Sequence, residues 1–437
     1  MGEAPASRRM RNEERRPRRA VWIIAASAVL AAALLCGWIF WPEDAGVVPT
    51  AAAAYEPDYA VQYDGAELDE AYLGQIRSFA AKAGKELLNG QESIAYSPTT
   101  LYTALSMVTE LADGSSLQSL LGVLEAGGTE ELQRYSSGLW RYLCANPDMK
   151  APGKVMMANS LWLNRDYTFN GKTLQNLAGR YYVSSYTGDM MSEIPDMVSS
   201  WVKKQTNGLL DCQVQPNENT IAVLLSAIYF YDEWAEAFEE RSTVSGRFNA
   251  GEKWIDCNYM CRAEESCGYY QGGGVTAAAQ YFKNGGKMLF ILPDEGNSPA
   301  GVLSSSEFLT SLLAWENLEK ETGTADWMIP RFTLKNTLNL QDGLTALGLG
   351  ELFDSCGNPL PKLSSEPAFI GRAEQGAAVS IDEKGCEAAS YVEIEMQTKG
   401  ALPKQDVFMY LDRPFIFAIL SDNDVPLFLG VVHSPKG

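Results

Sequence analysis

Residues 381–400 read IDEKGCEAASYVEIEMQTKG, and this stretch decides how the rest of the chain is interpreted. From Cys386 onward every second side chain is small or apolar, and most of those between are polar. A period of two is typical of a half-buried β-strand. The expected strand, residues 386–397, is about twice the usual ~5–6 residues and follows Gly385, which can act as a backbone hinge because it has no Cβ. From this pattern alone, an ordinary edge strand remains an alternative.

Six further motifs occur in the rest of the chain. They are SPTT (97–100), NSLW (159–162), WVKKQTNG (201–208), LSAIYF (225–230) followed by Trp234 and Phe238, DRPFIF (412–417) and PLFLG (426–430). Together with DEKGCEAA (382–389), these segments resemble the serpins, the serine protease inhibitor family. In that family 382–389 corresponds to the hinge of the reactive loop, and the segment at 226–234 is usually Asn-Ala-Ile-Tyr-Phe-Lys-Gly-x-Trp. The resemblance runs from about residue 72 to the end, with the motifs in the family's order.

The resemblance implies a serpin fold, an α+β domain with three β-sheets, eight or nine helices and an exposed reactive-centre loop at about 383–406. Apolar periodicity independently predicts helices over 75–88 and from Ser97 onward. It predicts strands at 222–230, 288–292, 408–411, 415–420 and 427–432. Because no linker or internal repeat divides the chain after residue 70, residues 70–437 are expected to form one large domain.

The N-terminal region carries a different signal. Residues 1–19 hold seven arginines against three glutamates, although the whole chain has a net charge of −20. Residues 20–41 contain no charge, and 22 helical residues span ~33 Å, enough for a bilayer core. The positive-inside rule then predicts a signal anchor with the body outside the cell, and residues 42–69 as a flexible tether. A cleaved signal peptide, giving a secreted protein, is the alternative.

The composition argues against an enzyme. The only histidine, His433, lies near the C-terminus, and no phosphate-binding loop or Gly-x-Ser-x-Gly motif is present. Cys257, Cys261 and Cys267 lack the paired spacing and fourth ligand of a structural zinc site, so thiols or a disulfide are favoured over a metal. We expect no cofactor and no metal, and the acidic body argues against nucleic-acid binding.

The resemblance implies where a protease would attack. In serpins the attacked residue follows the hinge glutamate by sixteen positions, and Glu383 corresponds to that glutamate. The predicted reactive bond is therefore Lys399–Gly400, with the bonds after Thr398 and Lys404 as rivals; a count back from Pro414 instead reaches Pro403. A lysine at this position suits a trypsin-like protease. The partner would be such a serine protease in a covalent acyl complex, with the serpin itself a monomer.

Three sets of residues complete the predicted site. The hinge comprises Glu383, Lys384, Gly385, Cys386, Glu387, Ala388, Ala389 and Ser390. The inserting strand would bury Val392, Ile394 and Met396. The cluster beneath the insertion site, here called the shutter cluster, comprises Ser97, Thr100, Ser226 and Gln375.

The shutter cluster departs from the family pattern, which usually has histidine at 375 and asparagine at 226. We expect Gln375 and Ser226 to hydrogen-bond each other through amide and hydroxyl. The predicted function is irreversible inhibition of an extracellular serine protease. A non-inhibitory serpin used for binding at the surface, and an inhibitor of a cysteine protease, remain the alternatives.

Overall fold

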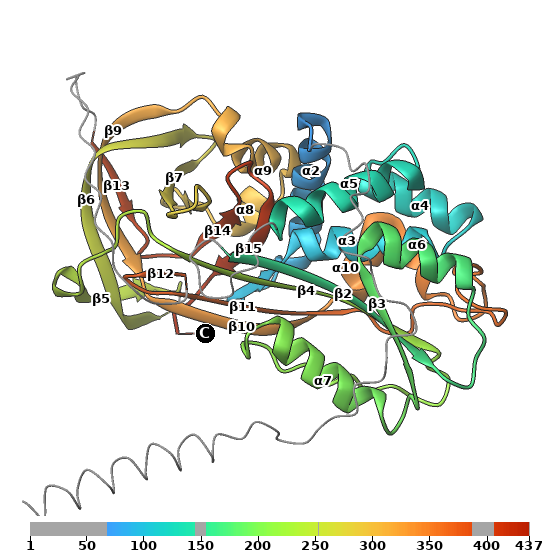
Figure 1. Ribbon diagram of the computed structural model, residues 1–437. Helices are drawn as coiled ribbons and strands as arrows, with labels where there is room; N and C mark the ends of the chain where they lie inside the picture. The colour runs from blue at the N-terminus through green and yellow to red at the C-terminus, as the bar shows by residue number, and fades with distance from the viewer. Residues whose placement is uncertain (1–67, 145–153, 252, 387–405, 437) are drawn as a thin grey trace, which may run out of the picture. The chain divides into compact units, whose positions relative to one another are not determined.

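The computed structural model describes residues 68–144, 154–251, 253–386 and 406–436 (Figure 1). Nine α-helices lie in these residues: α2 Glu70–Leu87, α3 Pro98–Thr109, α4 Gly114–Leu124, α5 Thr129–Leu143, α6 Gly171–Tyr181, α7 Ile194–Gln205, α8 Pro299–Leu303, α9 Ser306–Leu313 and α10 Gln341–Leu344. Short turns of other helix types are η1 Glu240–Ser242, η2 Trp315–Asn317, η3 Thr345–Leu349 and η4 Gly350–Phe353.

Fifteen strands lie in the same residues. They are β1 Ile94–Tyr96, β2 Lys154–Asn164, β3 Val183–Gly188, β4 Ala222–Glu233, β5 Val244–Asn249, β6 Trp254–Gly272, β7 Val275–Tyr281, β8 Lys287–Pro293, β9 Glu321–Pro330, β10 Phe332–Asn339, β11 Glu374–Ile381, β12 Gly385–Cys386, β13 Asp406–Tyr410, β14 Phe415–Leu420 and β15 Pro426–Val432.

The strands form three sheets. A nine-stranded sheet runs β1-β15-β14-β8-β7-β6-β9-β13, with β5 paired to β6; a four-stranded sheet runs β12-β4-β2-β3; and β10 pairs with β11. Helix α7 lies on one face of the four-stranded sheet, and α3 and α5 lie on the other (Figure 1). Among the described residues, three sheets and nine α-helices confirm the predicted α+β architecture.

Helix starts follow from local capping. Asp69 accepts a hydrogen bond from the Tyr72 backbone N (2.9 Å), so α2 begins five residues before the predicted start. The helix predicted from Ser97 onward is confirmed as α3; Ser97 caps it, and Pro98 occupies the first turn, where its missing N–H costs nothing.

The core is centred on the last two strands. Every residue of β14 and β15 is buried, and α2 and α3 pack against β15. The apolar sequence of both strands explains this position, because a strand buried on both faces needs no polar alternation.

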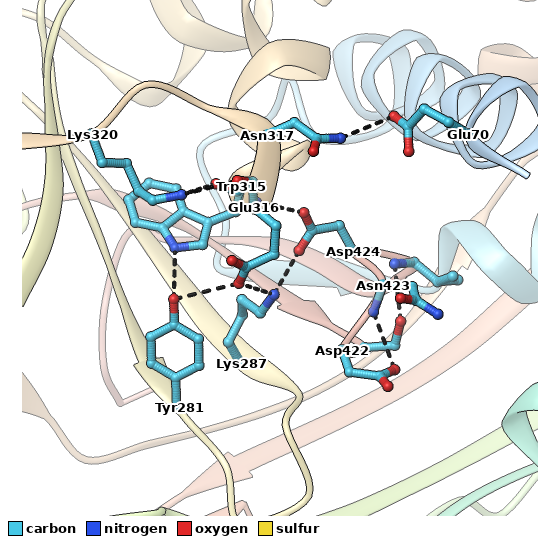
Figure 2. Close-up of polar contacts among 12 residues, drawn as sticks. Glu70, Tyr281, Lys287, Trp315, Glu316, Asn317, Lys320, Asp422, Asn423 and Asp424 are labelled. Carbon is cyan, nitrogen blue, oxygen red and sulfur yellow. Dashed lines mark hydrogen bonds and ion pairs between the residues drawn. The ribbon is translucent and has the colours of Figure 1, made fainter.

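An ion-pair cluster around the buried Lys287 fixes the turn between β14 and β15 (Figure 2). The Lys287 ammonium is almost fully buried and donates to Glu316 Oε1 (2.6 Å) and Asp424 Oδ1 (2.8 Å). The Glu316 backbone N in turn donates to Asp424 Oδ2 (2.7 Å). Burial acts to raise the pKa of Glu316, but the hydrogen bond and charge of Lys287 outweigh it and leave the pKa lowered. The start of β8, the η2 turn and the C-terminal hairpin are thus joined.

The basic segment 1–19, the predicted anchor 20–41 and the tether up to residue 67 lie outside the described residues. Among the helices that the structure does describe, none combines the length and the apolar content needed to cross a membrane.

Candidate reactive-loop hinge and insertion site

The chain reverses direction between β11 and β12, and this turn is held against the end of β4. The Asp382 backbone N donates to the Gly385 carbonyl oxygen (3.0 Å), which closes the turn. From the β4 side, the Trp234 backbone N donates to the Lys384 carbonyl oxygen (2.9 Å), and the Trp234 indole Nε1 donates to the Asp382 carbonyl oxygen (2.8 Å). These bonds fix the start of the predicted reactive loop.

Glu383 anchors the turn through its side chain, which is buried. Arg331 donates to Glu383 Oε1 through Nε (2.7 Å) and Nη2, and the Thr243 hydroxyl donates to the same oxygen. Burial acts to raise the pKa of Glu383, but the hydrogen bonds from Thr243 and Arg331 outweigh it and the pKa is lowered. Glu383 is therefore a charged group held by a hydroxyl and a guanidinium.

Gly385 permits a close approach between the hinge and β4. Its φ is +156°, and an added Cβ would lie 2.4 Å from the Asp232 carbonyl oxygen and 2.6 Å from Glu233 Cα. Both atoms belong to the backbone and cannot turn aside as a side chain would. Glycine at this position is what allows β12 to pair with β4, with Cys386 opposite Asp232.

Asp232 is a buried carboxylate beside the hinge strand, with 1% of its surface exposed. It accepts hydrogen bonds from Asn284 Nδ2 (3.1 Å) and the Glu233 backbone N (2.8 Å), and none of the ion pairs recorded among the described residues includes it. Burial raises the pKa of Asp232 to about 6, although these hydrogen bonds act to lower it. Neighbouring Glu233 is paired with Lys283 (2.6 Å).

A cavity of about 540 Å³ separates β4 from β11. Its lining includes residues 224–230 of β4, several residues of β11, the N-terminus of α3 and Cys386. Within the described residues β4 has β12 as its only strand neighbour on this side, so the edge of β4 below Asp232 has no strand partner. The cavity is several times larger than the roughly 150 Å³ void of an engineered core cavity. Native interiors leave few such voids.

All four members of the shutter cluster line the cavity, but hydrogen bonds join only three of them. Gln375 Oε1 accepts from the Ser97 backbone N (2.8 Å), and Gln375 Nε2 donates to the Ser97 carbonyl oxygen (3.0 Å) and Thr100 Oγ1 (2.8 Å). The buried Ser226 hydroxyl has no hydrogen-bond partner. The expected Ser226–Gln375 hydrogen bond is therefore wrong, because the cavity lies between β4 and β11 and the amide of Gln375 is used by α3.

The structure describes four of the eight predicted hinge residues. Glu383, Gly385 and Cys386 are buried and Lys384 is exposed. The remaining hinge residues, the three apolar residues of the inserting strand and the reactive bond lie outside the described residues: Glu387, Ala388, Ala389, Ser390, Val392, Ile394, Met396, Lys399 and Gly400.

Arg331, Thr243 and Asp232 were not predicted from the sequence. Arg331 follows Pro330 at the end of β9, and its partner Glu383 is 52 positions away, so no local pattern links the two. Asp232 could have been found from the sequence as a departure from the family pattern Asn-Ala-Ile-Tyr-Phe-Lys-Gly-x-Trp, because it occupies the glycine position of that pattern.

Neither a disulfide nor a metal site involves the cysteines or the histidine in the part of the chain that the structure describes. No disulfide joins the seven cysteines there, and no cluster of His, Cys, Asp and Glu has the geometry of a metal site within these residues. The His433 backbone N donates to Ser93 Oγ (2.9 Å), and burial lowers the pKa of the His433 side chain.

Comparison with known proteins identifies the class to which this fold and hinge belong. The family model described as Serpin (serine protease inhibitor) matches residues 75–435. The chain therefore belongs to the serpin family, whose members are generally inhibitors of serine proteases.

Curated relatives match most of the chain at low identity. "Serpin-ZX" of Arabidopsis thaliana is 24% identical over 381 residues, which cover 83% of this chain and 97% of that protein. "Alpha-1-antiproteinase" of Rattus norvegicus is 24% identical over 425 residues, which cover 94% of this chain and 98% of that protein.

Solved structures confirm the fold. The thermophilic serpin tengpin in its native state superposes with a TM-score of 0.77 at 23% identity, covering 88% of this chain and 99% of tengpin. Human thyroxine-binding globulin superposes with a TM-score of 0.71 at 23% identity, covering 84% of this chain and all of that one.

Proposed function

We propose that this serpin irreversibly inhibits an extracellular trypsin-like serine protease by loop cleavage and strand insertion. The protease would cut the Lys399–Gly400 bond, and residues 386–397 would then enter the cavity between β4 and β11. The observation that carries the proposal is this cavity, because the hinge strand β12 already occupies one end of it.

The registers on both sides of the cavity support the same alignment. On β4, Cys386 pairs antiparallel with Asp232, so the residue numbers of any two residues that face each other across these strands add up to 618. On the β11 side, the hydrogen bond from the Asp382 backbone N to the Gly385 carbonyl oxygen pairs residues whose numbers add up to 767. Continued down the cavity, these registers would place Ala388 between Phe230 and Val379. Val392 would then lie between the two sides of the shutter cluster, Ser226 and Gln375.

The same registers fit the alternation of the loop sequence. Directly paired residues of adjacent strands point to the same face of a sheet. Phe230 on β4 and Val379 on β11 both belong to the buried core. The small and apolar set of the loop would therefore face the core, and the glutamates would face outward. Two independent strand edges thus support the face predicted from the sequence.

The energetics show what the sheet must supply. Burial of Val392, Ile394 and Met396 is worth ~1.5–3 kcal/mol each, whereas ordering twelve backbone residues costs ~1–2 kcal/mol apiece. Side chains alone therefore cannot drive insertion. New hydrogen bonds along β4 and β11 and closure of the cavity would supply the balance. The uncleaved protein is accordingly expected to be metastable.

The division of labour follows from the mechanism. The serine of the protease would attack the Lys399 carbonyl carbon, form an acyl ester and release the amine of Gly400. This chain would contribute the bait and the inserting strand, and no catalytic group. Inhibition then depends on whether insertion is faster than attack of water on the ester.

A reaction with trypsin tests the proposal. The full-length protein is mixed with trypsin and analysed on a denaturing gel and by mass spectrometry. We expect a covalent complex and a released fragment of 38 residues, Gly400 to Gly437. Cleavage without a complex, and without a gain in thermal stability of the cut protein, would refute strand insertion and favour the non-inhibitory alternative.

We also propose that the N-terminal segment places the serpin domain outside the cell. The arginines of residues 1–19 and the uncharged run 20–41 support a signal anchor. Fractionation of cells and protease treatment of intact cells test it: the anchored protein is expected in the membrane fraction and sensitive to external protease. A protein released without residues 1–41 would instead indicate a cleaved signal peptide.

A further inference from the structure

Two aromatic side chains project from β13, the strand that follows the reactive loop. Phe408 is 55% exposed and Tyr410 is 39% exposed, and their ring centroids are 5.6 Å apart. The alternate residues Val407 and Met409 are buried in the core. β13 therefore has a normal inner face, and its outer face carries large apolar groups in contact with water.

The outer face continues onto the neighbouring strands. β13 pairs in parallel with β9, with Phe408 opposite Asp326 and Tyr410 opposite Met328. Asp326 and Met328 are partly exposed, whereas Ala325 and Trp327 are buried. We define this surface as the β13 face: Asp406, Phe408, Tyr410, Asp326 and Met328. Figure 1 shows β13, β9 and β6 side by side at one end of the molecule.

The charge on the β13 face has one sign. Asp406 and Asp326 both lie on it, and neither takes part in an ion pair among the described residues. An apolar centre with an acidic border is the complement of an apolar patch bordered by lysine or arginine. Aromatic side chains are also the residues that most often dominate binding energy at protein interfaces.

The position along the chain indicates which partner can reach the β13 face. Lys399 precedes Asp406 by seven residues, which span at most ~25 Å when extended. A protease domain of about 220 residues has a radius of gyration of ~17 Å. A protease engaged at Lys399 therefore has a diameter larger than the distance to β13, and its surface can reach the β13 face while the bond is held in its active site.

We propose that the β13 face is a second contact site for the target protease, selecting a trypsin-like enzyme with a basic border and an apolar patch beside its active site. The inference rests on the proposed function, because the partner is the protease that attacks the loop. It adds a determinant of specificity outside the loop. The contact would accelerate association before cleavage and would leave the insertion step unchanged.

The test compares rates of cleavage on full-length proteins. The variant Phe408→Ser/Tyr410→Ser is reacted with cationic trypsin, and kcat/KM for cleavage of the loop is measured by mass spectrometry. The matched control is Phe369→Ser/Trp254→Ser, which removes two aromatic residues of similar exposure, 41% and 57%, elsewhere on the surface. A synthetic peptide of residues 393–405 reports the rate that the loop alone supports.

We expect the Phe408/Tyr410 variant to lose roughly fivefold to thirtyfold in kcat/KM, and the control to keep the wild-type value. The variant Asp406→Asn/Asp326→Asn is expected to be cleaved by cationic trypsin with a lower kcat/KM at low salt. Its kcat/KM with an anionic trypsin, or with cationic trypsin at high salt, should change little. Unchanged melting temperatures would show that the variants fold. The wild-type protein should also be cut faster than the peptide.

Four outcomes would overturn the proposal: equal rates for the wild type and the Phe408/Tyr410 variant, an equal loss in the control, no cleavage of the loop by trypsin, and a wild-type dimer that the Phe408/Tyr410 variant converts to monomer. The last would assign the β13 face to a second copy of the chain. The rate comparison is independent of the inhibitory mechanism. A wild-type protein that is cleaved without a covalent complex would refute inhibition and would still decide whether the second contact exists.

Discussion

Replacement of Ala388 by arginine tests whether the loop enters the sheet. The continued registers place position 388 between Phe230 and Val379, whose side chains are 8% and 4% exposed. Insertion would bury an arginine among apolar groups with no carboxylate opposite it. An unpaired buried charge costs several kcal/mol.

The expected effect on inhibition follows from this penalty. If the burial penalty raises the activation free energy of insertion by ~3 kcal/mol, the insertion rate falls about a hundredfold. For a wild-type protein in which about one acyl-enzyme in ten is hydrolysed, the number of inhibitor molecules consumed per protease rises from near one to about ten or more.

The assay is a titration of trypsin with each variant, followed by a denaturing gel. Glu387→Arg is the matched control, because position 387 belongs to the alternate set of the loop sequence, and the native residue there already carries a charge. We expect Ala388→Arg to be cleaved as a substrate and Glu387→Arg to inhibit. An unchanged stoichiometry for Ala388→Arg would refute insertion in this register.

Three more predictions concern the bait and the hinge. Lys399→Glu should abolish the reaction with trypsin, whose pocket carries a carboxylate, and leave thermal unfolding unchanged; retained inhibition would move the reactive bond elsewhere. Gly385→Ala should lower the free energy of unfolding by ~1–3 kcal/mol, because its Cβ meets the β4 backbone at 2.4 Å. The control is Gly122→Ala on α4, where the added Cβ meets nothing within 4 Å; this replacement should stabilise the helix by ~0.5–1 kcal/mol. If urea unfolding showed the same loss of stability for both variants, the argument would be contradicted. Asp232→Asn should stabilise the protein by up to ~3 kcal/mol above pH 6. Folding raises the pKa of Asp232 from 3.8 to about 6, so the native wild-type protein loses stability as the pH rises through this range. Asparagine carries no charge and avoids this loss. The gain should vanish below pH 4, and a gain that is the same at pH 4 and pH 7.5 would contradict it.

Strongly apolar elements were predicted well from the sequence. The strand at 415–420 was predicted with its observed bounds, and the strand at 427–432 differs by one residue, because six or seven consecutive apolar residues allow only a buried element. β6 was not predicted, although it has nineteen residues, because its sequence mixes charged residues and cysteines without a clear apolar period. The strand also pairs with both β7 and β9, with a register shift in its pairing to β9.

The hinge was found from its sequence, but its supports were not. Gly385 was selected as a hinge, and the structure adds the physical reason, a backbone contact with β4. The pairing of Arg331 with Glu383 depends on tertiary structure that no period in the sequence encodes. The failed Ser226–Gln375 bond has a different origin, because the cavity between β4 and β11 sets the distance between the two residues, and no local pattern in the sequence reveals that cavity.

The pairing of β1 with β15, in which Ile94 lies opposite Val431, places the first and last strands of the domain side by side. Residues 406–436 supply three strands of the nine-stranded sheet: β15 and β14, which are wholly buried and lie next to β1, and β13 at the opposite edge. During synthesis these residues leave the ribosome after every other strand of the sheet, so the nascent domain lacks two of its fully buried strands until they emerge. The largest sheet therefore cannot be completed until residues 406–436 have been synthesised, and a chain that must cross a membrane would reach the translocation channel before its core can close.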